Sequence, residues 1–263
     1  MNLARDAPIP KCPLPGHSWG AIVCKQDATW LCSYKTDSIA TSSHHKYIFL
    51  AANSKFKGMN DMRKYEKARV LKEKIKDIRE DYLKKIEDKD IRNRQLGVAT
   101  YLIDTLALRA GNEKDSEEEA DTVGCCSLRV EHIEILPNNQ IKLDFLGKDS
   151  MRYENVVTVR AEVWKAIEGF LKNKKPEEDL FDKIDAQALN DYLKSMMEGL
   201  TAKVFRTYNA SITLQNELKK VNLKGKTMQE KVDVYDEANK QVAILCNHQK
   251  TVSKKQVESL KTK

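Results

Sequence analysis

The chain has 263 residues, which is enough to bury a substantial core in one large domain or two modest ones. Charged residues make up 32% and aromatic residues 7% of it, and its formal charge of +7 suits a polyanionic partner, although mild basicity alone is weak support. No apolar run approaches the length of a membrane span and the first residues lack a signal-peptide core, so we expect a soluble, intracellular protein with no membrane partner.

The first fifty residues predict a small β-rich region. Residues 1–18 are rich in proline and are typical of an extended lead-in. Three β-prone runs follow, separated by polar turns, at 19–24, 29–34 and 46–50. We expect these runs to form a small antiparallel patch.

A long amphipathic helix is predicted to begin near residue 60. Apolar residues recur there at three- and four-residue spacing, with Lys, Arg and Glu between them: Leu71, Ile75, Ile78, Tyr82 and Ile86. This single stripe favours packing against a core over a coiled coil. A second helix is expected from Asp90 to Leu108, with Leu102, Ile103 and Leu106 buried.

An acidic turn at 113–121 leads into a predicted antiparallel β-meander. Its three strands are joined by turn sequences rich in Pro, Asn, Gly and Asp, and span 127–136, 140–146 and 151–158. The pattern is helical beyond Val159, with helices predicted at 160–173, 186–198, 201–220 and 227–245, and another starting at 252. We therefore predict an α+β fold that is mainly helical, with a small three-stranded meander against the helical bundle.

Four basic side chains stand out because each lies at the edge of an apolar element: Arg109, Lys148, Arg206 and His248. Taken singly, each has an ordinary explanation. Arg109 and His248 could simply cap helices, and Lys148 could be a plain surface residue in a turn. Arg206 shares a helical face with Lys203, and such a pair is usually just solvated.

Taken together, these four side chains form a set suited to a phosphodiester. Two guanidinium groups can grip its nonbridging oxygens, and an imidazole can add a further hydrogen bond. A lysine can protonate a departing oxygen. Such a site needs no metal, and we expect no cofactor. The cysteines do not suggest one either, since no Cys-x-x-Cys pair occurs and adjacent Cys125 and Cys126 cannot comfortably face one ion, so buried free thiols are expected.

Long segments around these residues resemble eukaryotic type IB DNA topoisomerase I. They read IDTLALRAGNEK at 103–114, EEEADTVGCCSL at 117–128, DFLGKDS at 144–150, MEGLTAKVFRTYNAS at 197–211 and AILCNHQ at 243–249. The resemblance extends over essentially the whole chain. It implies the fold of the DNA breaking-rejoining enzymes and the activity of a nuclear isomerase, which relaxes supercoiled double-stranded DNA through a transient 3′-phosphotyrosyl bond without ATP or metal.

The resemblance also implies roles for individual residues. Arg109, Arg206 and His248 would hold the scissile phosphate. Lys148 would be the general acid for the 5′-hydroxyl leaving group. Six residues would contact DNA or shape the site beside it: Lys57, Asn112, Lys114, Thr122, Asp149 and Lys203. Contacts of this kind hold phosphates without reading bases, so weak sequence preference follows.

The sequence departs from the family pattern in one respect that matters for chemistry. The family's nucleophilic tyrosine lies in a C-terminal segment beyond a helical linker, whereas no tyrosine follows Tyr235 here, and Tyr208 matches a different part of the motif. The resemblance divides the chain into a remnant of the preceding core subdomain (1–52), a catalytic core (53–250) and the start of a basic linker (251–263). We expect the chain alone to be inactive, with a separate segment or subunit supplying the tyrosine.

Two alternatives stay open on the sequence. The first is a non-catalytic module that grips duplex DNA by charge, and its binding would depend steeply on salt. The second is a tyrosine recombinase or integrase, which uses the same Arg, Lys and His chemistry and would bind paired specific sites. The long matched segments around Arg109 and Lys148 favour the topoisomerase over the recombinase.

Overall fold

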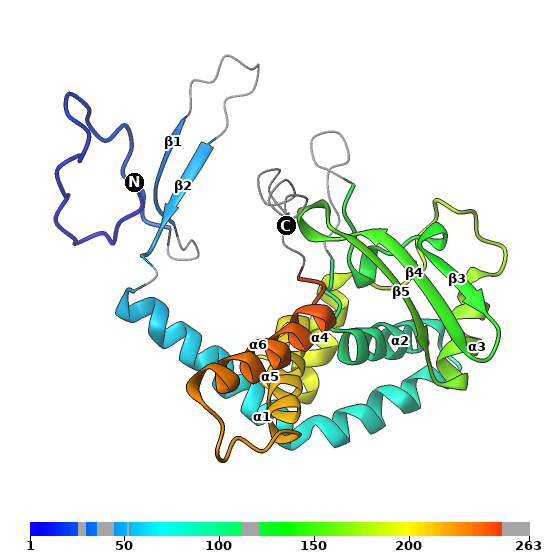
Figure 1. Cartoon of the computed structure of the whole chain (residues 1–263). Coiled ribbons are helices and arrows are strands. Elements are labelled where there is room, and N and C mark those ends of the chain that lie inside the picture. Colours follow the sequence, from blue (N-terminus) through cyan, green and yellow to red (C-terminus); the bar gives the residue numbers. More distant parts are fainter. Residues whose placement is uncertain (26–29, 36–44, 52, 112–120, 249–263) are drawn as a thin grey trace, which may run out of the picture. The chain divides into compact units, whose positions relative to one another are not determined.

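The computed structural model describes residues 1–25, 30–35, 45–51, 53–111 and 121–248. The chain forms two compact units, Met1–Arg63 and Lys64–Lys263 (Figure 1). Every buried apolar residue of the described chain lies in the second unit, which therefore holds the hydrophobic core. Among the described residues, no helix combines the length and the apolar character that crossing a bilayer requires.

The described part of the first unit contains an antiparallel strand pair. β1 (Trp30–Lys35) pairs with β2 (His45–Phe49), and the register shifts just after Trp30. Two of the three predicted β-prone runs are therefore confirmed as an antiparallel patch.

The strand predicted at 19–24 is wrong. Val23 makes an isolated parallel bridge with Asn2 instead. The Asn2 side chain accepts a hydrogen bond from the Lys25 amide at 2.8 Å and donates one to the Lys25 carbonyl at 3.0 Å. Because one side chain occupies both backbone groups of Lys25, this part of the chain does not continue into a ladder with another strand.

Helix α1 (Lys55–Ile86) begins in the first unit and continues into the second. It starts at Lys55 and not near residue 60 because the Ser54 hydroxyl accepts a hydrogen bond from the Lys57 amide at 3.2 Å, which caps the first turn. The predicted apolar stripe is confirmed, since all of its members are buried: Leu71, Ile75, Ile78, Tyr82 and Ile86.

Helix α2 (Ile91–Leu106) runs through the core of the second unit. It begins after Asp90, whose carboxylate accepts a hydrogen bond from the Arg92 amide at 2.9 Å. It ends before the predicted Leu108 because Ala107 adopts a left-handed φ of 51° and so turns the chain out of the helix.

The burial predicted along α2 is largely confirmed. Leu102 and Ile103 are fully buried. Leu106 was expected to be buried with them, but it is only half-buried, because the last turn of α2 borders a cavity. The apolar end of this helix therefore forms part of a cavity wall.

A buried carboxylate fixes how three helices meet. Asp104 in α2 accepts two hydrogen bonds from Arg79 of α1, at 2.8 and 3.1 Å, and one from the Tyr82 hydroxyl at 2.8 Å. The hydrogen bond to Asp104 raises the pKa of Arg79. The backbone carbonyl of Asp104 also accepts a hydrogen bond from Asn209 of α5 (Ala202–Lys219). A satisfied polar network of this kind specifies one arrangement of the helices.

The predicted β-meander is confirmed. β3 (Ile133–Leu136), β4 (Gln140–Leu146) and β5 (Arg152–Thr158) form an antiparallel sheet in the order β3-β4-β5. Leu146 pairs with Arg152 at the end of the β4–β5 hairpin. This end of the sheet carries the turn that contains one of the predicted site residues.

The first strand is shorter than the predicted 127–136. Two 3₁₀ turns, Cys125–Ser127 and Val130–His132, take the place of its first half. The Nδ1 atom of His132 accepts a hydrogen bond from the Arg129 amide at 3.0 Å. This amide is therefore used by a local side chain and not by a neighbouring strand.

The remaining helices are α3 (Ala161–Leu171), α4 (Ala186–Met196) and α6 (Met228–Leu245), together with α5. All four agree with the predicted helices to within two residues at each end. The helix predicted from residue 252 lies outside the described residues. α5 and α6 pack side by side, and α2 contacts α3, α4 and α5 (Figure 1). The predicted α+β, mainly helical fold class is confirmed.

Candidate functional site

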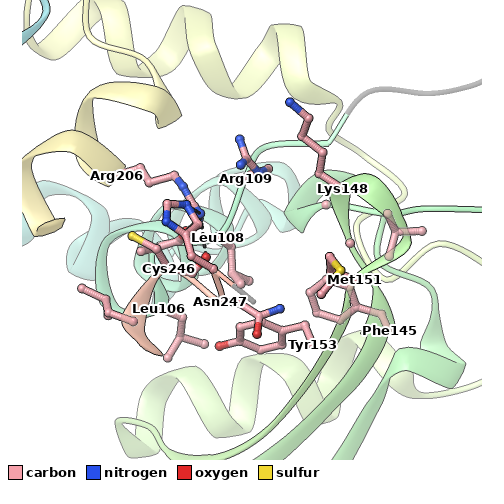
Figure 2. A pocket seen from close by; sticks show the side chains of 16 residues that line it. Leu106, Leu108, Arg109, Phe145, Lys148, Met151, Tyr153, Arg206, Cys246 and Asn247 are labelled. Atoms are coloured by element: carbon pink, nitrogen blue, oxygen red, sulfur yellow. Dashed lines mark hydrogen bonds between the residues drawn. The ribbon is translucent and has the colours of Figure 1, made fainter. Parts of the chain in front are cut away.

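The four cationic residues that the sequence singles out line one cavity of about 190 Å³ in the second unit (Figure 2). Each comes from a different part of the fold. Arg109 follows α2, Lys148 lies between β4 and β5, Arg206 lies in α5, and His248 follows α6. No Asp or Glu is among the described residues that line this cavity, so the described part of its wall offers cations without a carboxylate beside them.

Arg206 lies at the centre of the hydrogen bonding around the cavity. Its Nη1 donates to the Ala107 carbonyl and its Nη2 to the Cys246 carbonyl, each at 2.6 Å. Its Nη2 also lies 3.2 Å from Nε2 of His248. Burial, and secondarily the charge of Arg109, lower the pKa of Arg206. A guanidinium stays protonated even so, and this one is held by carbonyl oxygens that do not neutralise it.

His248 is held against Arg206 by the way α6 ends. The His248 amide donates to the Ala243 carbonyl at 2.8 Å, across a left-handed residue, Asn247. Burial, and then the charges of Arg206 and Arg109, lower the pKa of His248. The neutral ring is therefore favoured near pH 7, and its Nε2 can accept a hydrogen bond from Arg206.

Arg109 lies on a segment that is fixed through its backbone. The Arg109 carbonyl accepts a hydrogen bond from the Cys125 amide at 2.8 Å. Next to it, Gly111 has a φ of 81° and touches Gly124: a Cβ on Gly111 would lie 2.7 Å from the Gly124 Cα, and one on Gly124 would lie 2.4 Å from the Gly111 nitrogen. Only glycine fits at this crossing.

Lys148 lies at the first position of the 3₁₀ turn Lys148–Ser150 and is exposed. The turn is closed by a hydrogen bond from the Gly147 amide to the Met151 carbonyl at 2.8 Å. The turn joins the rest of the site through the Val123 amide, which donates to the Leu146 carbonyl at 2.8 Å. In Figure 2 the Lys148 side chain extends outward beside Arg109.

A second cavity, of about 620 Å³, shares Arg109, Lys148 and Arg206 with the first. Thr122 and Lys203, two of the predicted DNA contacts, line it as well. No carboxylate is among its described lining residues either. Arg109, Lys148 and Arg206 therefore line both cavities.

The other predicted contacts divide into three groups. Lys57 lies in α1 within the first unit, and both cavities belong to the second. Asn112 and Lys114 lie outside the described residues. Asp149 lies in the same 3₁₀ turn as Lys148. For these residues, as for the others, the DNA contact stays a prediction.

A tyrosine also lines the first cavity, but it is suited to the wall and not to attack on phosphorus. Tyr153 stacks on Phe145 with ring centroids 5.1 Å apart, and its hydroxyl accepts a hydrogen bond from Asn155 at 3.3 Å. Burial raises its pKa, which disfavours the phenolate. Among the described residues, no cluster of His, Cys, Asp or Glu could hold a metal ion.

Sequence reasoning missed several residues of the site. Val123 and Gly124 line both cavities, and Asn190 lines the second. Asn247 lines the first, and a signal for it was present: an Asn directly after a helical pattern marks a left-handed helix end. Of the cysteines, Cys125, Cys126 and Cys246 are buried free thiols as expected, whereas Cys24 is exposed.

Comparisons with known proteins match both parts of the chain. Residues 1–50 match the model for the DNA-binding fragment of eukaryotic DNA topoisomerase I, and residues 53–263 match the model for its catalytic core. DNA topoisomerase 1 beta of Arabidopsis thaliana is 53% identical over 266 residues, covering 100% of this chain and 29% of the relative.

Relatives from animals are similar at the same level. DNA topoisomerase 1 of Caenorhabditis elegans is 50% identical over 272 residues, covering 99% of this chain and 33% of the relative. DNA topoisomerase 1 of Homo sapiens is 48% identical over 271 residues, covering 100% of this chain and 35% of the relative. The chain thus spans about a third of the length of these curated relatives.

Proposed function

This chain belongs to the eukaryotic DNA topoisomerase I family, and on that premise we propose that its cationic cavity holds the scissile phosphodiester of duplex DNA during transient cleavage of one strand. The observation that carries the proposal is that Arg109, Lys148, Arg206 and His248 line one cavity without a carboxylate among its described lining residues. The reaction is relaxation of supercoils, and the cellular place is the nucleus. Residues 53–250 act as the catalytic core, with the fold of the DNA breaking-rejoining enzymes.

The donors of Arg206 support a phosphate ligand. A guanidinium has five N–H groups, and the carbonyls of Ala107 and Cys246 and the ring of His248 engage three of them. Two remain for phosphate oxygens, and a third becomes available when the contact with His248 opens. Arg109 supplies the second guanidinium. The two together stabilise the extra negative charge of a five-coordinate transition state, where such donors have their largest effect.

Lys148 acts as the general acid. Departure of the 5′-oxygen requires a proton, and an exposed lysine on the rim of the cavity can deliver it to a strand that crosses the rim. Lys148→Ala should slow cleavage by about 10²–10⁴-fold. A duplex with sulfur at the 5′-bridging position has a leaving group that needs no proton, so it should restore the rate. An equal defect on both duplexes would contradict the role.

The nucleophile is a tyrosine from outside these 263 residues, either in the same polypeptide or in another chain. Tyr153 is buried against Phe145 and is poorly suited to the task. After attack, the tyrosine holds the 3′ end covalently, the free end rotates, and the 5′-hydroxyl reverses the step. No ATP or metal takes part in this scheme, because arginine, lysine and histidine supply the positive charge and the proton.

The second cavity supports a duplex partner. It extends the cationic surface past the reacting phosphate, with Thr122 and Lys203 in its wall. Contacts of this kind grip phosphates regardless of sequence. A non-catalytic DNA clamp would use the same surface, so binding alone does not separate the two functions. The recombinase alternative has less support, since the matched relatives are topoisomerases along the whole chain.

Reconstitution tests the proposal. The chain is mixed with a separately expressed C-terminal segment that carries the family's tyrosine, and relaxation of supercoiled plasmid is followed in EDTA without ATP. Relaxation and a covalent complex on the 3′ end are expected, and both should disappear in Arg206→Ala. Salt-dependent DNA binding with neither cleavage nor relaxation would favour the non-catalytic clamp instead.

A further inference from the structure

The residue before His248 has an uncommon conformation. Asn247 has a φ of 48°, and α6 ends around it through two backbone hydrogen bonds: the Asn247 amide donates to Ile244 at 3.0 Å and the His248 amide to Ala243 at 2.8 Å. Helices that end in this way usually place glycine at the left-handed position, and asparagine less often. The backbone here therefore accepts glycine at least as readily as asparagine.

The asparagine side chain has a second connection, which glycine would lack. Its Nδ2 donates to the carbonyl of Arg152 at 3.1 Å. Arg152 is the first residue of β5 and lies two residues after the end of the turn that presents Lys148. Asn247 therefore links the end of α6, which carries a phosphate-binding residue, to the hairpin that carries the general acid.

This link closes a ring of hydrogen bonds around the cavity. Arg206 joins the end of α2 to the end of α6 through the carbonyls of Ala107 and Cys246. Asn247 joins the end of α6 to Arg152. Arg152 pairs with Leu146 in the sheet, and the Leu146 carbonyl accepts a hydrogen bond from the Val123 amide. The Cys125 amide donates to the Arg109 carbonyl, so all of these links are between backbone groups. In this ring Arg206 and Asn247 provide the side-chain links.

We propose that Asn247 is a positioning residue, which holds the Lys148 turn at its working distance from the phosphate-binding end of α6. The inference rests on the proposed function of the cavity, which assigns no task to Asn247. General acids act only within hydrogen-bond reach of the leaving oxygen. A displacement of about 1 Å in a catalytic group can cost roughly 10²-fold in rate. Loss of the link should therefore impair protonation of the leaving group more than it impairs DNA binding.

Asn247→Gly separates this role from helix termination, because it keeps the left-handed backbone and removes the side chain that makes the link to Arg152. The matched control is Asn139→Gly, the same exchange at a φ of 56° in the β3–β4 turn, at the other end of β4 from Lys148. In the enzyme reconstituted with the tyrosine-bearing segment, single-turnover cleavage by Asn247→Gly should be slower by about 10–100-fold. DNA affinity and the unfolding midpoint should stay close to those of the unsubstituted chain.

The 5′-bridging sulfur duplex distinguishes positioning of the acid from a general disturbance. Asn247→Gly should cleave it at nearly the unsubstituted rate, and Asn139→Gly should cleave both duplexes normally. An unchanged rate on the ordinary duplex, or an equal loss on both duplexes, would overturn the inference.

Hydrogen exchange on the chain alone gives a second readout that needs no activity. The Gly147 amide, which closes the Lys148 turn, should lose protection in Asn247→Gly and keep it in Asn139→Gly. Unchanged protection would overturn the inference even if cleavage were slow. If the unsubstituted reconstituted enzyme does not cleave at all, the proposed function fails. The exchange experiment then still decides whether Asn247 holds the turn.

Discussion

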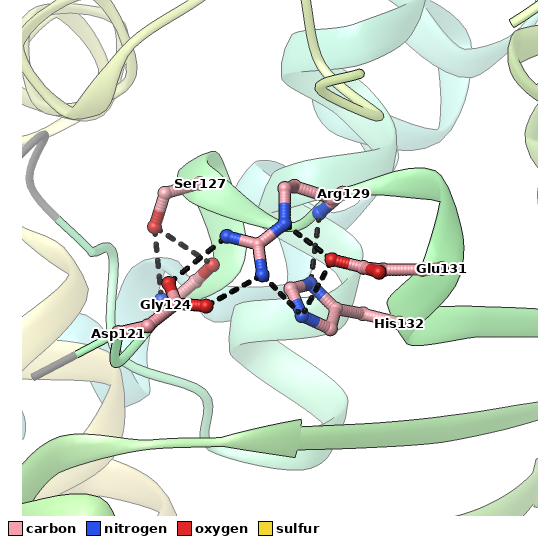
Figure 3. A network of polar contacts seen from close by, with 6 residues as sticks. All are labelled: Asp121, Gly124, Ser127, Arg129, Glu131 and His132. Carbon is pink, nitrogen blue, oxygen red and sulfur yellow. Dashed lines mark hydrogen bonds and ion pairs between the residues drawn. The ribbon is translucent and has the colours of Figure 1, made fainter. Parts of the chain in front are cut away.

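Two arginine–histidine pairs in this chain have the same spacing and opposite surroundings. Nη2 of Arg206 lies 3.2 Å from Nε2 of His248, and Nη2 of Arg129 lies 3.2 Å from Nε2 of His132. Figure 3 shows that Arg129 is enclosed by carboxylates: it donates to both oxygens of Asp121 at 3.0 and 2.8 Å, and to Glu131 at 2.6 Å. Arg206 has carbonyl oxygens in their place.

The surroundings change what each pair can do. The hydrogen bond to Asp121 raises the pKa of Arg129, whereas burial lowers that of Arg206. The Nδ1 atom of His132 accepts a hydrogen bond from the Arg129 amide, which favours the neutral form of the ring. The Arg129 cluster is thus a neutralised clamp that holds the segment before Val123, and Arg206 keeps unbalanced charge for a ligand. Carboxylates, and not the arginine–histidine pair itself, therefore distinguish the Arg129 cluster from the site that we propose binds phosphate.

The largest expected difference concerns the shape of the cation. Arg206→Lys keeps the charge but loses the planar fork, and it should slow single-turnover cleavage in the reconstituted enzyme by about 10²–10³-fold. Arg129→Lys, its counterpart, should change the rate by less than about tenfold, because Arg129 is not among the described residues that line either cavity. Equal losses in the two variants would remove the functional distinction between the pairs.

A carboxylate introduced into the wall of the cavities should partly neutralise the positive charge of Arg206, as carboxylates do for Arg129. Val123 lines both cavities, so Val123→Asp brings a negative charge into their shared wall. Affinity for a short duplex at fixed salt should fall by about tenfold, which corresponds to roughly 1.4 kcal/mol. Val123→Asn is the neutral control of similar size. If both variants bound equally, charge in the wall would not govern binding.

Removal of the clamp should affect stability more than chemistry. The Arg129 side chain is 24% exposed and bridges two acids, so Arg129→Ala should lower the free energy of unfolding by about 1 kcal/mol in urea titrations. Arg160→Ala, which removes a single pair with Glu162 in which the arginine is more exposed than Arg129, should change it by less than about 0.5 kcal/mol. A larger loss for Arg160 would contradict this ranking.

The smallest effects concern the two imidazoles. Burial lowers the pKa of His248 and of His132 below 6.5. Between 6.5 and those lowered values the unfolded chain binds more protons than the folded one, so stability should fall as the pH drops through this window. Added duplex DNA should raise the pKa of His248 and leave that of His132 unchanged, as NMR titration of the ring protons can test. Parallel shifts in both would argue against a phosphate beside His248.

Sequence reasoning predicted elements well where the pattern was local. The stripe of α1 and the bounds of β4 follow from periodicity and turn residues that lie close together. The prediction of a strand at 19–24 was wrong because the conformation there depends on Asn2, whose side chain forms hydrogen bonds with the backbone of Lys25. The first half of the strand predicted at 127–136 was wrong because the His132 ring accepts a hydrogen bond from the Arg129 amide, within a local turn.

The same contrast between local patterns and long-range contacts applies to the residues of the site. The four cations stand out in the sequence because each lies at the edge of an apolar element, and the family resemblance then adds long-range information that supports them as one set. The side-chain hydrogen bond of Asn247 could not be predicted because its partner, Arg152, is 95 positions away in the sequence. The lack of carboxylates among the described residues of the cavity walls was equally invisible in the sequence, since it depends on which partners the fold gives to acids such as Asp121 and Glu131.

The contact between Gly111 and Gly124 sets the dimensions of the site in an unusual way. The distance between the Arg109 segment and the wall at Val123 is fixed by two backbones that touch, and not by side chains of adjustable length. A methyl group at either position would act as a wedge. No second substitution could accommodate it by becoming smaller, because the opposing residue has no side chain to shorten. The two backbones therefore already lie as close together as they can, and evolution or engineering can only move them apart.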